Sequence, residues 1–148
     1  MTNSDFIDEY RYHSADASHT SGYLWQKVEH ILRYNQDCVR ERGESSVFDL
    51  GCGNGAFTRR LKQLGISASG VDISSSGVAY AKSACPEIQI EEGSVYDDLA
   101  SKYGQFPVVV SLEVVEHLYS PQIFAKNLFN LVQPGGIAII STPYHGYF

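Results

Sequence analysis

The stretch Val47-Phe48-Asp49-Leu50-Gly51-Cys52-Gly53-Asn54-Gly55-Ala56 decides the fold, because a short apolar strand there runs into a glycine-rich turn that opens a helix. Glycines in such a turn allow positive φ angles and let a ligand lie against the backbone. Helical spacing follows directly, with apolar residues at Phe57, Leu61 and Leu64. The stretch therefore predicts a strand, a binding turn and a helix in succession.

Strands and helices alternate from Ser46 onward. Apolar, β-rich segments predict five strands, at residues 46–50, 67–73, 88–90, 106–112 and 137–142. A mixed acidic connection is expected after the third strand, and Pro134-Gly135-Gly136 is expected to break the chain before the fifth. The alternation predicts an α/β fold, a Rossmann-like doubly wound sheet that is mostly parallel and binds its ligand at the carboxyl ends of the strands.

The part of the chain before Ser46 divides in two. Residues 1–20 are polar and lack a period, which is typical of a flexible arm or lid. Residues 21–43 carry apolar side chains at helical spacing, so we expect a helix that packs on the sheet. Residues 21–148 are accordingly expected to form one cofactor-binding domain.

The composition is that of one soluble globular domain, with 148 residues of which 43% are hydrophobic and 19% charged. Eleven basic against seventeen acidic residues give a net charge of −6, which opposes bulk binding of nucleic acid. No apolar stretch approaches the ~20 residues that span a bilayer, and the first residues lack a secretory signal, so we expect a cytoplasmic protein without a transmembrane segment. Cys38, Cys52 and Cys85 form no C-x-x-C pair and are expected as reduced thiols.

Asp49, two residues before the first glycine, discriminates between ligands of the turn. A carboxylate there repels the pyrophosphate of a nicotinamide or flavin dinucleotide, although Gly51, Gly53 and Ala56 satisfy the looser dinucleotide pattern G-x-G-x-x-A. S-adenosylmethionine instead carries an α-ammonium and a sulfonium, which an acidic residue favours. A phosphate-binding P-loop is excluded, because Gly55 is followed by Ala-Phe and not by Lys-Ser/Thr.

Asp72 ends the second predicted strand, 23 positions after Asp49. One strand-helix-strand step takes about 20 residues, and an acidic group at this place accepts hydrogen bonds from both ribose hydroxyls. Ile73 follows and is placed to cover one face of the adenine. The two acidic residues therefore predict the two ends of a nucleoside cofactor.

Four motifs follow one another between Ser46 and Tyr147: VFDLGCGNGAF, GVDIS, SLEVVEHL, and LVQPGG followed by IAIISTPYHGY. Together they resemble successive motifs of class I S-adenosylmethionine-dependent methyltransferases, within the type 11/23 group that includes the ubiquinone-biosynthesis O-methyltransferases. The resemblance implies transfer of a methyl group from S-adenosylmethionine to a small-molecule acceptor, at oxygen, by direct in-line displacement. Proximity and alignment supply most of the acceleration in such a reaction.

The resemblance also implies roles for individual residues. The turn residues implied to bind the cofactor are Asp49, Gly51, Gly53, Asn54 and Gly55, and the aspartate and glycines line its amino-acid end. Asp72 and Ile73 are implied at the ribose and adenine, and Glu113 at the methionine. Ser94 stands where many members carry an aspartate that receives the adenine amino group, and the Val95 N–H is expected at the same ring.

The segment Glu113-Val114-Val115-Glu116-His117 follows the fourth strand at the cofactor edge. A helical turn would place Glu113, Glu116 and His117 on one face, where they are candidate ligands for a divalent metal ion. Similar segments are metal sites in small-RNA 2′-O-methyltransferases and in some ubiquinone-pathway enzymes, so a metal-assisted 2′-O-methyltransferase acting on RNA is an alternative function. Three interpretations stay open: a metal site with His145 as the natural fourth partner, a general base or substrate contact with His117 as the candidate catalytic residue, or structural support.

Rival functions and an incomplete domain also stay open. A cofactor-binding module without catalysis, as a fragment or partner subunit, is one alternative, and an NAD-dependent oxidoreductase is another that Asp49 disfavours. The sheet of the resembling family continues beyond the fifth strand with a helix and an antiparallel hairpin, whereas this sequence ends at Phe148. We therefore expect a C-terminally truncated domain with an apolar edge strand, or a homodimer that covers this edge.

Overall fold

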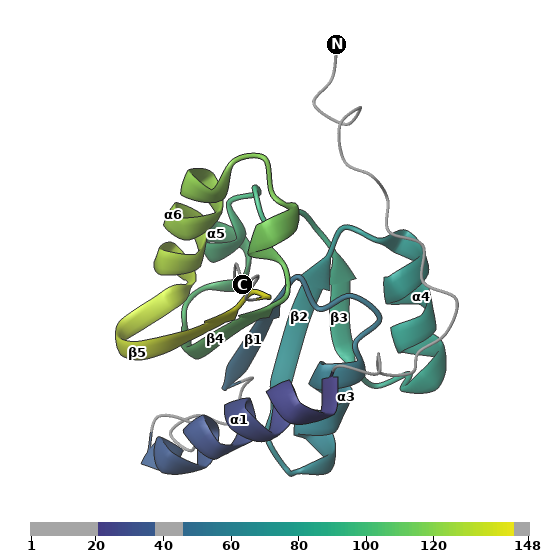
Figure 1. Cartoon of the computed structure of the whole chain (residues 1–148). Helices are drawn as coiled ribbons and strands as arrows, with labels where there is room; N and C mark the ends of the chain where they lie inside the picture. Colours follow the sequence, from purple (N-terminus) through teal and green to yellow (C-terminus); the bar gives the residue numbers. More distant parts are fainter. Residues whose placement is uncertain (1–20, 38–45, 144–148) are drawn as a thin grey trace, which may run out of the picture.

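A five-stranded sheet with helices on both faces forms the centre of the computed structural model, which describes residues 21–37 and 46–143 (Figure 1). The strands are β1 (Val47–Leu50), β2 (Ala68–Asp72), β3 (Gln89–Glu92), β4 (Phe106–Leu112) and β5 (Val132–Ser141). The helices are α1 (Ser21–Tyr34), α3 (Ala56–Gln63), α4 (Ser75–Ala84), α5 (Leu99–Tyr103) and α6 (Pro121–Leu131), with the 3₁₀ turn η1 (Val115–His117) after β4. Within this described part, no helix is long and apolar enough to cross a membrane.

The strand order is β3-β2-β1-β4-β5, and every pairing of neighbours is parallel. The chain moves outward from β1 to β3 on one side of the sheet and then crosses to β4 and β5 on the other. Ligands of such sheets bind at the carboxyl ends of the strands where the direction reverses, which here is between β1 and β4. The predicted fold, a Rossmann-like doubly wound sheet of five strands, is confirmed.

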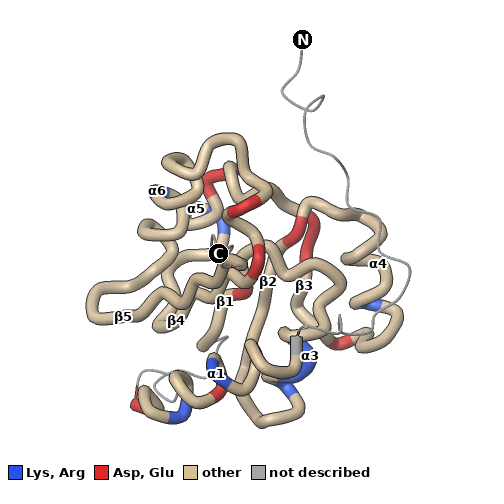
Figure 2. The backbone as a smooth tube through the Cα atoms, in the orientation of Figure 1, with Lys and Arg blue, Asp and Glu red and all other residues tan. Residues whose placement is uncertain are grey.

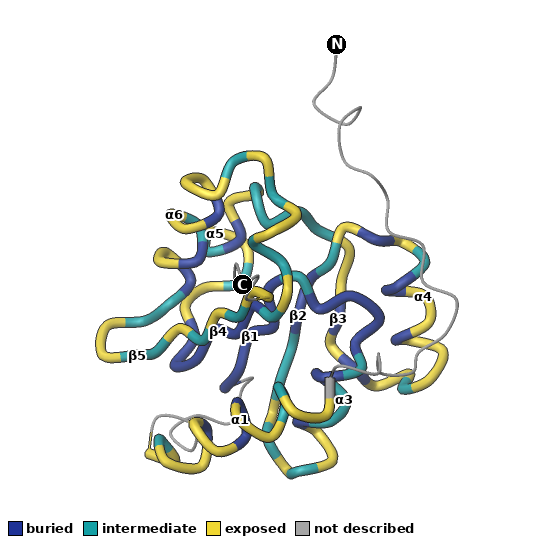
Figure 3. Tube along the Cα trace, in the orientation of Figure 1, coloured by how far each residue is buried: buried dark blue, intermediate teal, exposed yellow. Residues whose placement is uncertain are grey.

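The inner strands β1 and β4 are buried almost throughout, which explains their apolar runs (Figure 3). One buried cluster joins the sheet to α5 and α6 and consists of Phe48, Leu50, Val71, Leu99, Phe106, Val109, Phe124, Leu128 and Leu131. A second cluster joins the sheet to α1 and α3 and consists of Val28, Leu32, Val47, Phe57, Leu61, Val108 and Val110. Successive residues of each strand therefore pack into opposite cores, as the period of two requires.

Helix α1 packs on the sheet, as the spacing of its apolar residues predicts. The ring of Trp25 on α1 packs against the ring of Phe57 on α3, with 5.6 Å between the ring centroids. The buried carboxylate of Glu29 accepts a hydrogen bond of 2.8 Å from Arg60 Nε of α3, which fixes the helix against its neighbour. The arm predicted at residues 1–20 and the last part of the predicted helix lie outside the described residues.

The connection after β3 corrects one sequence prediction, because it contains the helix α5. Asp98 caps this helix, since its carboxylate accepts a hydrogen bond of 3.3 Å from the N–H of Ser101. Leu99 is the buried residue of the helix. A helix of five residues shows too little of a 3.6-residue period to be recognised in the sequence.

Strand β5 corrects a second prediction, because it begins at Val132 and not after Pro134-Gly135-Gly136. The pairing passes from Phe106 opposite Val132 to Val108 opposite Ile137, so the glycines form an irregularity within the strand. β5 has β4 as its strand neighbour in the described part of the chain and lies at the edge of the sheet, where Ile140 is half exposed. The apolar edge is as predicted, and its cover by a second subunit stays a prediction.

Two phenylalanines of α6 test the described core. Phe124 is 2% exposed and Phe129 is 75% exposed. Replacing Phe124 by alanine is expected to lower the free energy of unfolding by ~3–5 kcal/mol, because it leaves a cavity between α6 and the sheet. Phe129→Ala, the matched control on the same helix, is expected to change it by less than about 0.5 kcal/mol. Urea unfolding measures both, and equal effects of the two substitutions would contradict the packing of α6.

Candidate functional site

The glycine-rich turn leaves β1 at the carboxyl edge of the sheet and is packed closely from both sides. Gly51 has a φ of 81°, and a Cβ on it would lie 2.6 Å from Val114 Cγ2. Gly55 has a φ of 70°, and a Cβ on it would lie 2.5 Å from Ile90 Cδ1. Both positions therefore require glycine for conformation and for space. The buried Asn54 supports the start of α3, since its Oδ1 accepts a hydrogen bond of 3.2 Å from the N–H of Ala56.

Asp49 lies beneath this turn and is 2% exposed. Thr58 Oγ1, on α3, donates a hydrogen bond of 2.7 Å to Asp49 Oδ2. Burial raises the pKa of Asp49 to about 7; the bond from Thr58 lowers it and the charge of Asp72 raises it, both by less. A cation bound nearby favours the ionised carboxyl, which is the electrostatic role that the sequence predicts for this residue.

Thr58, which binds the Asp49 carboxylate, is a residue of the site that sequence reasoning missed. Its signal was present, because this polar residue directly follows the buried Phe57 and precedes the buried Leu61 by three positions on the same helix. A hydroxyl on a buried helix face needs a hydrogen-bond partner, and Asp49 on β1 is that partner.

Asp72 connects the turn after β1 to the turn after β2. Its Oδ2 accepts a hydrogen bond of 2.8 Å from the N–H of Gly53, and its Oδ1 accepts one of 2.8 Å from the N–H of Ser74. Partial burial raises the pKa of Asp72, although both hydrogen bonds act in the opposite direction. Ile73, which follows it, is 40% exposed at the same edge, where an apolar surface is available to a planar ligand.

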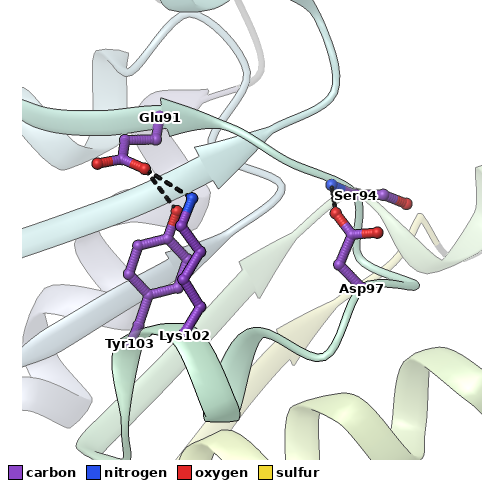
Figure 4. A network of polar contacts seen from close by, with 5 residues as sticks. All are labelled: Glu91, Ser94, Asp97, Lys102 and Tyr103. Atoms are coloured by element: carbon purple, nitrogen blue, oxygen red, sulfur yellow. Dashed lines mark hydrogen bonds and ion pairs between the residues drawn. The ribbon is translucent and has the colours of Figure 1, made fainter.

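Ser94 and Val95 lie in the turn after β3, and their polar groups serve this turn. The N–H of Ser94 donates to Asp97 Oδ2 at 2.8 Å (Figure 4). Ser94 Oγ accepts from the N–H of Tyr96 at 3.1 Å. Asn127 of α6 donates to the Val95 carbonyl at 3.0 Å. The sequence did not single out Asp97 or Asn127, because neither belongs to a periodic or glycine-rich pattern. The predicted contact of Ser94 and Val95 with adenine stays a prediction.

The segment after β4 corrects the expectation of one helical face. Glu113 has a φ of 57° and lies outside η1, and its carboxylate accepts a hydrogen bond of 2.7 Å from Ser141 Oγ. His117 Nε2 lies 3.9 Å from Glu116 Oε1. Within residues 21–37 and 46–143, no three acidic, histidine or cysteine side chains are grouped as metal ligands. The structure thus brings Glu116 and His117 close together, whereas Glu113, with its left-handed backbone, lies outside the helical turn and contacts Ser141. His145 lies outside the described residues.

Acidic residues gather at the carboxyl edge of the sheet, along the ends of the strands (Figure 2). The segments that follow the five strands, as far as they are described, contain no lysine or arginine. Lys102, on α5, donates to Glu91 at 2.9 Å. Acidic residues at or just beyond the strand ends are Asp49, Asp72, Glu92, Asp97, Asp98, Glu113 and Glu116. The edge therefore favours a cationic ligand over a phosphate.

The parallel sheet is doubly wound and has a glycine-rich turn with acidic residues beside it at its carboxyl edge. These features are typical of the Rossmann-like domains of S-adenosylmethionine-dependent enzymes. The chain belongs to the methyltransferase domain family Methyltransf_11, whose model matches residues 48–140. The matched residues reach from β1 into β5 and confirm the resemblance seen in the motifs.

Curated relatives and solved structures agree with this assignment. The chain is 33% identical over 100 residues to a ubiquinone biosynthesis O-methyltransferase of Caulobacter sp. strain K31, covering 65% of this chain and 40% of that protein. It is 30% identical over 120 residues to the enzyme of the same name from Rickettsia canadensis, covering 78% and 50%. An amino pentose methyltransferase from Micromonospora echinaspora, solved with S-adenosylmethionine, shares the fold with a TM-score of 0.66 at 19% identity, covering 82% and 50%. The chain thus spans about half the length of the relatives it matches.

The pKa of Asp49 predicts how stability depends on pH. A carboxyl whose pKa rises on folding binds more protons in the folded than in the unfolded chain between pH ~4 and ~7, so ionisation there destabilises the fold. Asp49→Asn is therefore expected to gain stability relative to the original chain as pH rises from 4.5 to 8, by ~3 kcal/mol in the free energy of unfolding.

Urea unfolding at the two pH values measures this difference. Asp98→Asn is the control, because hydrogen bonds from Ser101 lower the pKa of that exposed carboxyl. Its stabilising effect is already complete above pH ~4, so the difference between Asp98→Asn and the original chain is expected to be nearly the same at both pH values. A gap between Asp49→Asn and the original chain that is the same at both pH values would contradict a raised pKa.

Proposed function

We propose that this chain is the cofactor-binding part of a methyltransferase that transfers the methyl group of S-adenosylmethionine to an oxygen of a small-molecule acceptor. The observation that carries the proposal is a pair of acidic residues around the glycine turn. Asp49 is buried in β1, directly before the turn, and Asp72, at the end of β2, accepts a hydrogen bond from the N–H of Gly53. Membership of the methyltransferase family and the names of the similar O-methyltransferases support the same conclusion.

In this proposal each residue of the site binds a different part of the cofactor. Asp49 lies below the turn and stabilises the cationic amino-acid end by its charge, while the main chain of Gly51 and Gly53 lies against it. Asp72 accepts hydrogen bonds from the ribose, and the exposed Ile73 covers the adenine. S-adenosylmethionine, when bound, supplies a methyl group on a sulfonium. Alignment of this methyl group with the acceptor oxygen accelerates the transfer.

His117 is our candidate for the base that removes the acceptor proton. Its side chain is 77% exposed at the carboxyl edge, and its Nε2 lies 3.9 Å from the neighbouring Glu116 Oε1. This arrangement does not require a metal ion, since in the described chain Glu113 is held by Ser141 and not by the pair.

A small, uncharged or cationic acceptor fits this edge better than RNA does. The acidic side chains at the strand ends repel a phosphate backbone, and no lysine or arginine stands among them in the described segments. Metal-assisted methylation of RNA is therefore the less supported alternative. A cytoplasmic location stays a prediction from the sequence.

Calorimetry with S-adenosylhomocysteine tests the proposal directly. The chain is expected to bind this product, and Asp72→Asn is expected to weaken binding about 10- to 100-fold, since hydrogen bonds to a charged group are lost. Glu87→Gln, a matched control at an exposed ion pair with Lys62, is expected to bind as the original chain does. Absence of binding up to millimolar concentration would overturn the proposal, and binding of NAD in its place would favour an oxidoreductase.

A further inference from the structure

Glu113 has an unusual backbone conformation for its residue type. It is the one non-glycine residue with a positive φ in the described part of the chain, at 57°. Left-handed conformations are disfavoured for residues with a Cβ, and where they occur the surrounding structure has to hold them. Glu113 stands at the end of β4, where the chain turns across the glycine-rich turn toward η1.

Ser141, at the end of β5, holds Glu113 by three hydrogen bonds. Ser141 Oγ donates to Glu113 Oε1 at 2.7 Å. The N–H of Glu113 donates to Ser141 Oγ at 3.1 Å and to the Ser141 carbonyl at 3.2 Å. One hydroxyl thus fixes both the main chain and the side chain of the left-handed residue, because a serine hydroxyl can donate and accept at once.

The next residue, Val114, transmits this position to the turn after β1. A Cβ atom on Gly51 would lie 2.6 Å from Val114 Cγ2 and 3.1 Å from Val114 Cγ1. Val114 also packs against the core cluster that contains Phe48 and Leu50. A change in the backbone of Glu113 therefore moves Val114 relative to the first glycine of the cofactor turn.

We propose that Ser141 is a positioning residue for the cofactor site, which acts through Glu113 and Val114 to hold the glycine turn in its binding shape. The inference rests on the proposed function for the identity of the ligand. It goes beyond that function by placing a determinant of the site on β5, the edge strand, whose end lies one strand farther from the turn than β4 does.

The binding test is a double-mutant cycle measured by calorimetry with S-adenosylhomocysteine. Ser141→Ala is expected to weaken affinity about 3- to 30-fold, the range that contacts outside a ligand site produce. Ser141→Thr keeps the hydroxyl and is expected to retain affinity. Glycine adopts a positive φ without support, so in the Glu113→Gly background the further change Ser141→Ala is expected to have little effect. Ser83→Ala on α4, an exposed serine, is the matched control.

A second measurement needs no ligand. Hydrogen exchange followed by mass spectrometry is expected to show faster exchange at residues 51–55 and 113–117 in Ser141→Ala than in the original chain, with α1 unchanged. Unaltered exchange there and unaltered affinity would overturn the positioning role, as would an equal effect of Ser141→Ala with and without Glu113→Gly. If the original chain fails to bind, the proposed function falls, and the exchange measurement still decides whether Ser141 positions the turn.

Discussion

The hydrogen bond from Thr58 to the Asp49 carboxylate joins the centre of the sheet to the helix that follows the glycine turn. β1 has four residues and pairs with β2 and β4 on its two sides, so its end fixes where the ends of both neighbours meet. Because Asp49 is buried, a donor on α3 is needed wherever the carboxyl is ionised. The bond therefore sets the position of α3, and with it the turn that connects helix and strand.

Contacts across the carboxyl edge connect the ends of β1, β2, β4 and β5. Asp72 holds Gly53, so the end of β2 supports the turn after β1. Val114 covers Gly51 from the end of β4, and Ser141 holds the residue before it from the end of β5. The turns of a Rossmann-like sheet lie far apart in sequence, yet here they form one supported surface, and this is what allows short turns to present a defined site.

Sequence patterns predicted those features whose causes are local. The turn after β1 and the place of Asp72 follow from glycine spacing and from the length of one strand-helix-strand step. The left-handed Glu113 could not be predicted, because its hydrogen-bond partner Ser141 lies 28 positions later in the sequence. The start of β5 likewise depends on its pairing with Phe106 and not on the glycines near Val132. What sequence alone misses here is the effect of residues that become neighbours only in the folded chain.

The acidic edge also couples stability to ligand binding. Burial raises the pKa of Asp49 and of Asp72, so at neutral pH the ligand-free fold holds carboxyls in surroundings that disfavour their charge. A bound cation lowers both pKa values, because it stabilises the ionised carboxyls. By linkage, the ionised state, which destabilises the ligand-free fold, is the state that binds the cation more tightly. The same argument accounts for neutral Thr58 as the partner of Asp49. A lysine or arginine there would ionise the carboxyl permanently and neutralise the charge that a cationic cofactor needs.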